Sequence, residues 1–289
     1  VAKSFNYNDF ETLSATGNID ADFYIKSNTK KVSSKGYFKI PNSNINYKLY
    51  NLALNNINAD INFDDELQIK QIALSLFGQP LKIYGTVKNN SDTDIHITAE
   101  NILLKGLIAA AGQIQVLKEN SFNSGSLSLD ASLKGKLSNI IPTVNLAINN
   151  LNVKNIPSNT TITMPNAKFI LNTKGKSFTG DLSLYNLKVN NPMFNIALPD
   201  SQLLIQERDI DIQKAYLLFN NSRIDINGNI KDYMNDKLAI DISAKGNVLA
   251  NDIKTFIPNE MRSMFKSAGQ LPLVATVKGN LKKQNIMLT

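Results

Sequence analysis

Alternation of apolar and polar residues runs through most of this 289-residue chain. The segment 95–99 places Ile, Ile and Ala at every second position, and the segment 238–244 places Leu, Ile, Ile and Ala in the same way. A period of two is that of a β-strand, and polar residues at the intervening positions give each strand one dry face and one wet face. Turn signals such as Gly17-Asn18 and Gly279-Asn280 recur between the alternating segments. The pattern therefore predicts a mainly β chain of antiparallel strands.

A long internal repeat accompanies the alternation. The stretch Phe77–Leu137 returns in altered form as Phe219–Leu281, with Gly85 corresponding to Gly228. Repeated strand units predict a chain that extends along one axis by adding similar pieces. We therefore expect a first unit over residues 1–150 and a second unit over residues 151–289.

Two segments interrupt the alternation at equivalent places in the two copies. Apolar residues fall near helical spacing in a segment near 102–117 and in another near 251–267, so a short helical insertion is expected in each unit. In the second segment Asn251 or Asp252 is expected to cap the helix, and Pro258 is expected to divide it, with Asn259 capping the second piece.

Asparagine and proline predict the connections between strands. Asparagine tolerates the left-handed backbone region, so its doublets are expected at tight turns. The doublets are Asn55-Asn56, Asn89-Asn90, Asn149-Asn150 and Asn190-Asn191. The polar, proline-bearing segment Asn155–Pro165 is expected to be a loop or an edge crossing at the boundary between the copies.

Composition and charge argue against several classes of function. The net charge of +7 is carried mostly by dispersed lysines, and Arg208, Arg223 and Arg262 are the arginines of the chain. So few guanidinium groups argue against nucleic acid as a partner. The chain has no cysteine, which excludes disulfides and thiolate metal sites.

No motif of an enzyme is present. His96 is the only histidine, and it alternates out of phase with Ile95 and Ile97, so it is expected to face solvent. No phosphate-binding loop, nucleophile elbow or zinc-protease signature occurs. We therefore expect no catalytic residue, no metal site and no cofactor, and we expect that the protein is not an enzyme.

The motif G-x-L-x-L-x-x-x-x-x-G-x-L occurs twice, as Gly125–Leu137 and Gly269–Leu281. The second copy follows N-V-L-A-N-D-I-K-T-F-I-P-N-E, in which a strand end leads into a short helix with a proline; the first copy lacks that proline. This order resembles the AsmA-like superfamily of bacterial envelope proteins (AsmA/TamB/YhdP type), over roughly the whole chain. The resemblance implies a long, strongly curled antiparallel sheet with an apolar groove along its inside, sometimes called a β-taco.

The resemblance also implies a function and a location. Proteins of this superfamily are thought to bridge the inner and outer membranes and to conduct phospholipids. The chain is accordingly expected to be a periplasmic segment of a bridge-like lipid-transfer protein. Its partners would be phospholipid acyl chains and, through flanking regions, both membranes. The chain opens at Val1 and has no apolar run near 18 residues, so an inner-membrane anchor is expected in a segment outside this sequence.

The alternating aliphatic residues are the candidate site, and they permit two interpretations. In a β-sandwich they would be core, whereas in an open groove they would hold acyl chains. A structural or adhesive β-repeat scaffold that binds protein partners is the alternative function. The candidate groove residues are Leu81, Ile83, Ile95, Ile97, Leu127, Leu129, Leu133, Leu146, Ile148, Ile224, Ile226, Leu238, Ile240, Ile242, Leu271, Leu273 and Val277.

Overall fold

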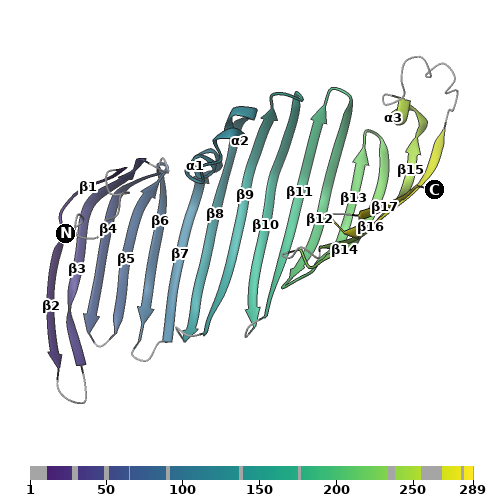
Figure 1. Cartoon of the computed structure of the whole chain (residues 1–289). Coiled ribbons are helices and arrows are strands. Elements are labelled where there is room, and N and C mark those ends of the chain that lie inside the picture. The colour runs from purple at the N-terminus through teal and green to yellow at the C-terminus, as the bar shows by residue number, and fades with distance from the viewer. Residues whose placement is uncertain are drawn as a thin grey trace. The chain divides into compact units, whose positions relative to one another are not determined.

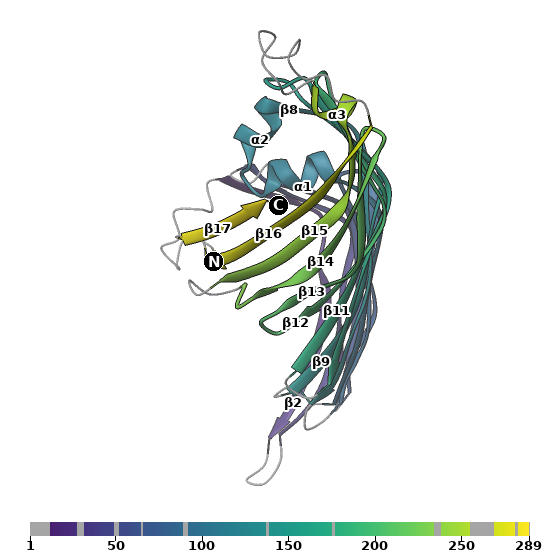
Figure 2. The same cartoon turned by 90° about the vertical axis from the view of Figure 1, so that its right-hand side faces the viewer.

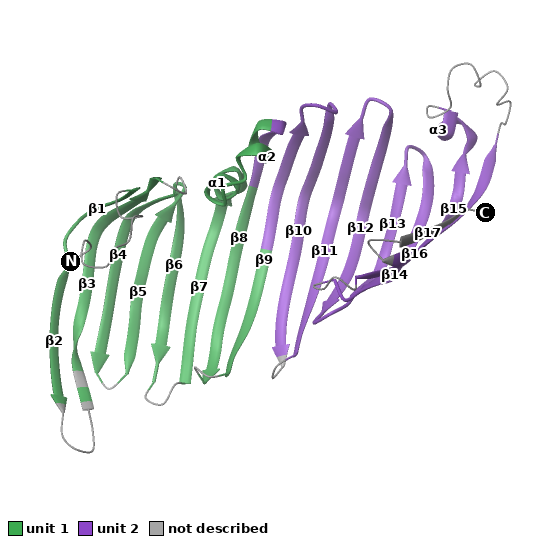
Figure 3. Cartoon of the chain, in the orientation of Figure 1, with its two compact units in different colours: residues 1–118, 126–146 green, residues 119–125, 147–289 purple. Residues whose placement is uncertain are grey.

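A computed structural model of the chain describes residues 12–27, 32–48, 52–64, 66–88, 92–136, 139–174, 177–233, 238–254, 269–280 and 283–288. These residues form long β-strands and three short helices (Figure 1). The chain divides into two compact units, with residues 1–118 and 126–146 in unit 1 and residues 119–125 and 147–289 in unit 2 (Figure 3). The division expected from the repeat, after residue 150, stays a prediction.

The strands follow one another along the chain with few interruptions. Unit 1 contains β1 (Leu13–Thr16), β2 (Asp20–Ser27), β3 (Val32–Tyr47), β4 (Leu52–Asp64), β5 (Leu67–Leu76), β6 (Gln79–Val87), β7 (Asp92–Leu103) and α1 (Leu104–Ala110). The elements α2 (Ile114–Glu119), β8 (Asn120–Lys136) and β9 (Asn139–Asn155) contribute residues to both units. Unit 2 continues with β10 (Thr160–Lys174), β11 (Ser177–Asn191), β12 (Phe194–Gln206), β13 (Ile210–Phe219), β14 (Ser222–Lys231), β15 (Ala239–Leu249), α3 (Ala250–Lys254), β16 (Gln270–Asn280) and β17 (Lys283–Leu288).

Consecutive strands pair antiparallel within each unit. In unit 1 the registers run from β2 through β8, and β1 pairs with the part of β3 that β2 does not reach. In unit 2 they run from β10 through β17. The prediction of a mainly β, antiparallel sheet with short helices is confirmed. The strong curl that the resemblance implied is not confirmed.

Asparagine residues form bulges inside several strands. Asn42, Asn56, Asn101, Asn150 and Asn186 all lie within strands and have φ between 45° and 54°. A left-handed residue inserted in one strand displaces the side chains that follow by one position. After each bulge the apolar residues therefore change from even-numbered to odd-numbered positions, or the reverse, and still lie on the same face of the sheet.

Side chains of the neighbouring strand satisfy the backbone at two of these bulges. The N–H of Asn56 in β4 donates to Oδ1 of Asn44 in β3 at 3.0 Å. The relation is reciprocal, because the N–H of Asn42 in β3 donates to Oδ1 of Asn58 in β4 at 3.0 Å. The sequence N-x-N on both strands thus supplies a bulge and an acceptor for the bulge opposite.

The expectation that the asparagine doublets mark turns is wrong at two of the four positions. Asn56 and Asn150 lie inside β4 and β9, where their tolerance of positive φ serves a bulge instead of a turn. The doublet Asn190-Asn191 closes β11 at the turn before β12, as expected. Asn89-Asn90 lies outside the described residues.

Helical residues occur in both expected insertions. The segment near 102–117 contains α1 and α2, separated by a turn at Gly112. In the segment near 251–267, α3 ends at Lys254, and the residues from 255 to 268, Pro258 and Asn259 included, lie outside the described residues. The expected capping role of Asn251 or Asp252 is wrong, since α3 begins at Ala250 and both residues lie within it.

The segment Asn155–Pro165 is not a loop along its whole length. Residues 156–159 form a tight turn, and β10 begins at Thr160 and runs through Pro165. No register between β10 and β11 is described at Pro165, where the pairing is interrupted between Thr163 and Asn166. A proline fits in a strand where its missing N–H is not needed for the ladder.

Equivalent glycines of the two copies have similar backbone φ angles. Gly85 and Gly228 have φ of 144° and 140°, and Gly135 and Gly279 have φ of 105° and 144°. These conformations are open to glycine and strained for other residues. The sequence repeat therefore reproduces backbone conformation as well as side-chain pattern.

Candidate functional site

One face of the sheet in unit 1 collects the candidate residues of β6, β7 and β8. Ile83 lies opposite Ile97, and Ile95 lies opposite Leu133. Directly opposed residues of antiparallel strands point to the same face. The other candidates of these three strands, Leu81, Leu127 and Leu129, fall on the same face, because the registers pair them with Ala99, Ile102 and Ala99 respectively.

The corresponding face in unit 2 is formed by β14, β15 and β16. Ile242 of β15 lies opposite Val277 of β16, and Ile226 of β14 lies opposite Ala244 of β15. The registers add Ile224, Ile240, Leu271 and Leu273 to this face. Leu238 precedes β15 and lies outside the strand.

The two candidates in β9 belong to the same pattern. The hydroxyl of Thr143 is hydrogen-bonded to that of Ser132, at 2.5 Å, and Ser132 lies opposite His96 on the polar face of β8. Leu146 is three residues from Thr143 and therefore faces the apolar side, and Ile148 follows two residues later in the same strand.

Sequence reasoning missed a large part of this face. The registers also place on it Phe38, Ile40, Ile57, Ile61, Ile69 and Ile72 of unit 1 and Ala167, Phe169, Leu182, Leu184, Leu187 and Leu203 of unit 2. Many of these residues lie beyond a bulge, where the alternation changes parity. The available signal was a pair of apolar residues three positions apart with an asparagine between them, as in Leu184 and Leu187 with Asn186.

The apolar face is only partly covered. Of the seventeen candidates, Ile224 is buried, at 8% exposed, and the others are half-buried. Residues that a two-layered domain would bury therefore remain partly accessible in the described part of the chain.

The described helices α1 and α3 each follow the end of a strand, β7 and β15 respectively. In unit 1 the backbone of Gly106 in α1 packs against the ring of Phe77, at the turn between β5 and β6. Figure 2 shows α1 and α2 beside one face of the sheet at that end. No helix in the described part of unit 1 lies over the side chains farther along β6 and β7 (Figure 2).

In unit 2 a buried polar contact holds α3. The hydroxyl of Ser222 donates to Oδ2 of Asp252 at 2.5 Å, and the N–H of Leu249 donates to the Ser222 hydroxyl at 2.8 Å. Asp252 also accepts from the N–H of Asn221 at 3.1 Å. Ser222 and Asp252 are 1% and 6% exposed, so the contact fixes α3 to the β13–β14 turn away from water.

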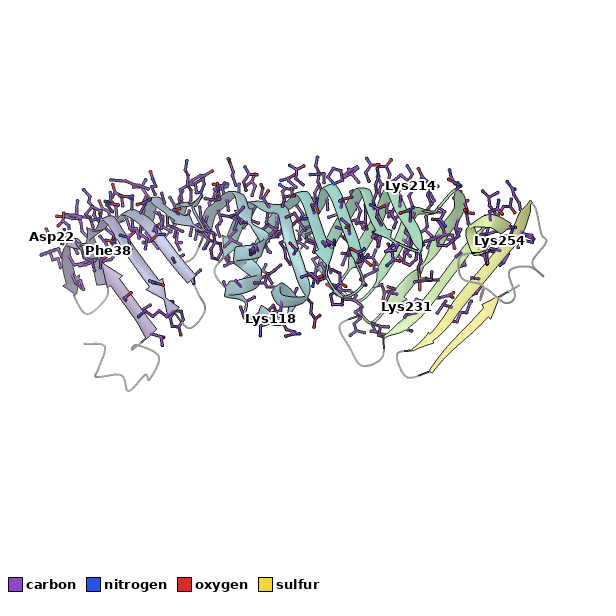
Figure 4. The ribbon with its side chains drawn as sticks, turned by 90° about the horizontal axis from the view of Figure 1, so that it is seen from above. Asp22, Phe38, Lys118, Lys214, Lys231 and Lys254 are labelled. Atoms are coloured by element: carbon purple, nitrogen blue, oxygen red, sulfur yellow. The ribbon has the colours of Figure 1, made fainter. Side chains whose placement is uncertain are left out.

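The opposite face is polar and hydrated. Cross-strand ion pairs lie on it, including Lys35 with Asp64 at 3.4 Å and Lys278 with Asp241 at 3.0 Å. In Figure 4 the side chain of Lys214 in unit 2 lies on a side of the ribbon where many side chains carry nitrogen and oxygen tips. Exposed pairs contribute little stability singly, but they keep this face in water.

His96 lies on this polar face, as the alternation predicts. Its ring stacks on Tyr84, with centroids 5.1 Å apart, and its Nε2 lies 3.0 Å from Oδ1 of Asp94. The side chain is 31% exposed. The histidine thus belongs to a half-buried surface cluster, on the side opposite the apolar face.

A shallow apolar depression lies on the apolar face of unit 1. Its volume is about 170 Å³, and Ile40, Ile45 and Ile57 line it together with Gly17 and Ile19. Such a depression suits an aliphatic group, because most of its lining is hydrocarbon. In the part of the chain that the structure describes, His, Asp and Glu side chains do not gather in groups of three or more that could hold a metal ion.

Comparison with known proteins gave no match, whether to protein-family models, to curated proteins or to solved structures. No described helix has both the length and the apolar character that crossing a membrane requires.

Proposed function

We propose that this chain is a segment of an AsmA-like, bridge-like lipid-transfer protein and that its apolar face binds phospholipid acyl chains. The observation that carries the proposal is the half-exposed state of that face in both units. In a closed β-sandwich, residues such as Ile242 and Leu273 would be buried beneath a second layer. In the described residues they are half-buried, with helices over one end of the strands only.

The energetics favour hydrocarbon as the ligand. Removing one methylene from water contributes about 0.8 kcal/mol, so a tail laid along several strands is held without any specific polar contact. Neighbouring positions on the face resemble one another, so that a tail can move along it with small changes in free energy. Movement of this kind needs neither a catalytic residue nor a cofactor.

The bulges support the finer part of the proposal, a groove. Bulges increase the local twist of a strand and bend it. Those at Asn42 and Asn56 face each other across β3 and β4, and both act at the same level of the sheet. A bend repeated in adjacent strands would make the apolar face concave, and the tails would lie in that hollow with their headgroups at its open margin.

The proposed setting is the periplasm of a bacterium with two membranes. An anchor in the inner membrane would belong to a segment outside this sequence, and lipid would pass between the inner and outer membranes along the repeated units. The repeat suits this role, because the same dry surface is supplied by strands of both copies.

Photocrosslinking tests the proposal. A photoreactive amino acid is placed at Ile240, Ile242 or Leu273 on the apolar face, and in matched variants at Asp241 or Lys278 on the polar face. After irradiation in cells, phospholipid adducts are expected from the first set and not from the second. The purified chain, extracted with organic solvent, is expected to release phospholipid. Absence of both adducts and co-purified lipid would remove the lipid-binding function and leave the face to a protein partner.

A further inference from the structure

The most exposed apolar side chains of unit 1 are concentrated on one strand. Ile25 is 69% exposed, Tyr24 65% and Phe23 55%, and Ile19 just before the strand is 67% exposed. All but Ile19 belong to β2, which forms one margin of the unit 1 sheet in Figure 3 and has its described register with β3. An exposed apolar strand at the margin of a sheet is a surface on which another strand can pair.

The sequence of β2 is complementary to itself. When two copies of Asp20–Lys26 are laid antiparallel about a two-fold axis through Phe23, each Asp20 faces the Lys26 of the other copy. Each Asp22 then faces Tyr24, and no like charges are opposed. On the apolar side Phe23 faces Phe23 and Ala21 faces Ile25. The registers with β3 assign these residues to the two faces in the same way, since Asp22 pairs with Tyr37 and Phe23 pairs with Gly36.

We propose that β2 is a homodimerisation strand, which pairs antiparallel with β2 of a second copy about a two-fold axis at Phe23. The interaction is isologous, so both copies use the same surface and the assembly closes at two. It joins the apolar faces of two copies edge to edge, because Phe23 and Ile25 lie on that face. The interaction involves only strand pairing and does not depend on lipid binding.

Other registers are less favourable. A shift of the axis to Asp22 would oppose two carboxylates, which is destabilising in a cross-strand pair. A shift to Tyr24 would keep Lys26 paired with Asp22 but would leave Asp20 without a partner in the strand. The axis at Phe23 pairs Asp20 with Lys26 at both ends of the strand and opposes no like charges.

Charge reversal tests the pairing in the full 289-residue chain. The association constant is measured by sedimentation equilibrium for the unchanged chain, for Asp20→Lys, for Lys26→Asp and for the double variant. Each single reversal opposes like charges twice and is expected to weaken the dimer about tenfold. The double variant restores opposite charges and is expected to recover most of the affinity. Loss of affinity in the double variant equal to that of the singles would contradict the pairing.

Cysteine scanning tests the register, because the chain has no cysteine of its own. Under mild oxidation Phe23→Cys is expected to form a disulfide-linked dimer, since the two residues meet at the axis and opposed Cα atoms lie within disulfide range. Tyr24→Cys is the matched control and is expected to crosslink much more slowly. Circular dichroism checks that both variants are folded. Faster crosslinking at Tyr24, or a chain that stays monomeric at every concentration, would overturn the proposal.

Discussion

The α-carbon of Gly85 lies so close to the carbonyl oxygen of Asp94 that a Cβ on the glycine would stand 2.1 Å from that oxygen. Gly228 stands in the same relation to Asp241 in the second copy, again at 2.1 Å. In both cases the partner is backbone, which cannot turn aside as a flexible side chain would.

Substitution of these glycines is expected to be costly. Gly85→Ala or Gly228→Ala should lower the free energy of unfolding by about 2–4 kcal/mol, because backbone strain and a steric clash act together. Gly112→Ala is the control: its φ is 73° but nothing lies within 4 Å of its added Cβ, so a loss of about 1 kcal/mol is expected. Urea denaturation followed by circular dichroism measures the three values. A loss at Gly85 no larger than at Gly112 would contradict the close approach.

The bulge at Asn101 makes a second prediction. Deleting Asn101 reverses the parity of the residue that follows and turns Ile102, 2% exposed, toward the polar face. A loss of roughly 3 kcal/mol or more is expected from the exposure of this side chain and the disturbed register. Asn101→Gly keeps the residue count and the left-handed conformation, and should change the free energy of unfolding by less than about 0.5 kcal/mol. Thermal and urea unfolding compare the two variants.

The contact between Ser222 and Asp252 predicts a coupling. Ser222→Ala leaves the part-buried N–H of Leu249 without the hydroxyl acceptor and removes one donor from the carboxylate, which should cost about 1–3 kcal/mol. The pair Ser222→Ala and Asp252→Ala should lose less than the sum of the single losses, since both remove the same hydrogen bond. A double-mutant cycle of unfolding free energies measures the coupling, and strict additivity would show that the contact does not stabilise α3.

Lipid binding should distinguish adjacent residues of one strand. Ile240→Asp places a carboxylate on the apolar face, where a passing acyl chain would force it to lose water, so the yield of co-purified phospholipid should fall at least severalfold. Asp241→Ala changes the polar face and should leave the yield unchanged. Mass spectrometry of solvent extracts gives the yields. Equal effects of the two substitutions would contradict the assignment of the faces.

The hydroxyl of Tyr37 donates to Oδ1 of Asp20 at 3.1 Å, and this hydrogen bond, with the negative charge of Asp20, raises the pKa of Tyr37. Because the pKa is raised on folding, the contact stabilises the folded state below the ordinary pKa of tyrosine, and this contribution is lost as the pH rises through the folded pKa. Asp20→Asn should move the Tyr37 pKa back toward its ordinary value. Tyrosine-selective NMR across pH 8–12 measures the shift (about the range in which tyrosine titrates), and an unchanged pKa would contradict the contact.

The fold was predictable where the alternation runs unbroken. Ile95, Ile97 and Leu133 were assigned to one face because each is two residues from the next of its kind, and that spacing identifies a strand without further information. The assignment failed to extend past the asparagines. A bulge inverts the parity, so Leu187 looks like a residue of the opposite face from Leu184 unless Asn186 is recognised as left-handed.

The sequence could not predict whether a second layer covers the apolar face, for a different reason. A strand in a sandwich and a strand in a single layer carry the same alternation, because both have one apolar side. Which case holds depends on whether a second layer is present, and that is decided by tertiary contacts. The position of α3 was likewise not predictable, since Asp252 resembles a helix cap in the sequence and instead accepts a hydrogen bond from Ser222, the first residue of β14.

An apolar sheet face that is half-exposed in the described part of the chain has a thermodynamic consequence. Whatever apolar molecule occupies the face completes the core, so its binding free energy adds to the free energy of unfolding by mass action, growing with the logarithm of its concentration. If the face binds lipid as proposed, the melting temperature of this chain depends on both the polypeptide and the bound lipid. A thermal shift assay across a titration of lipid would measure both the stability of the polypeptide and its affinity for the lipid.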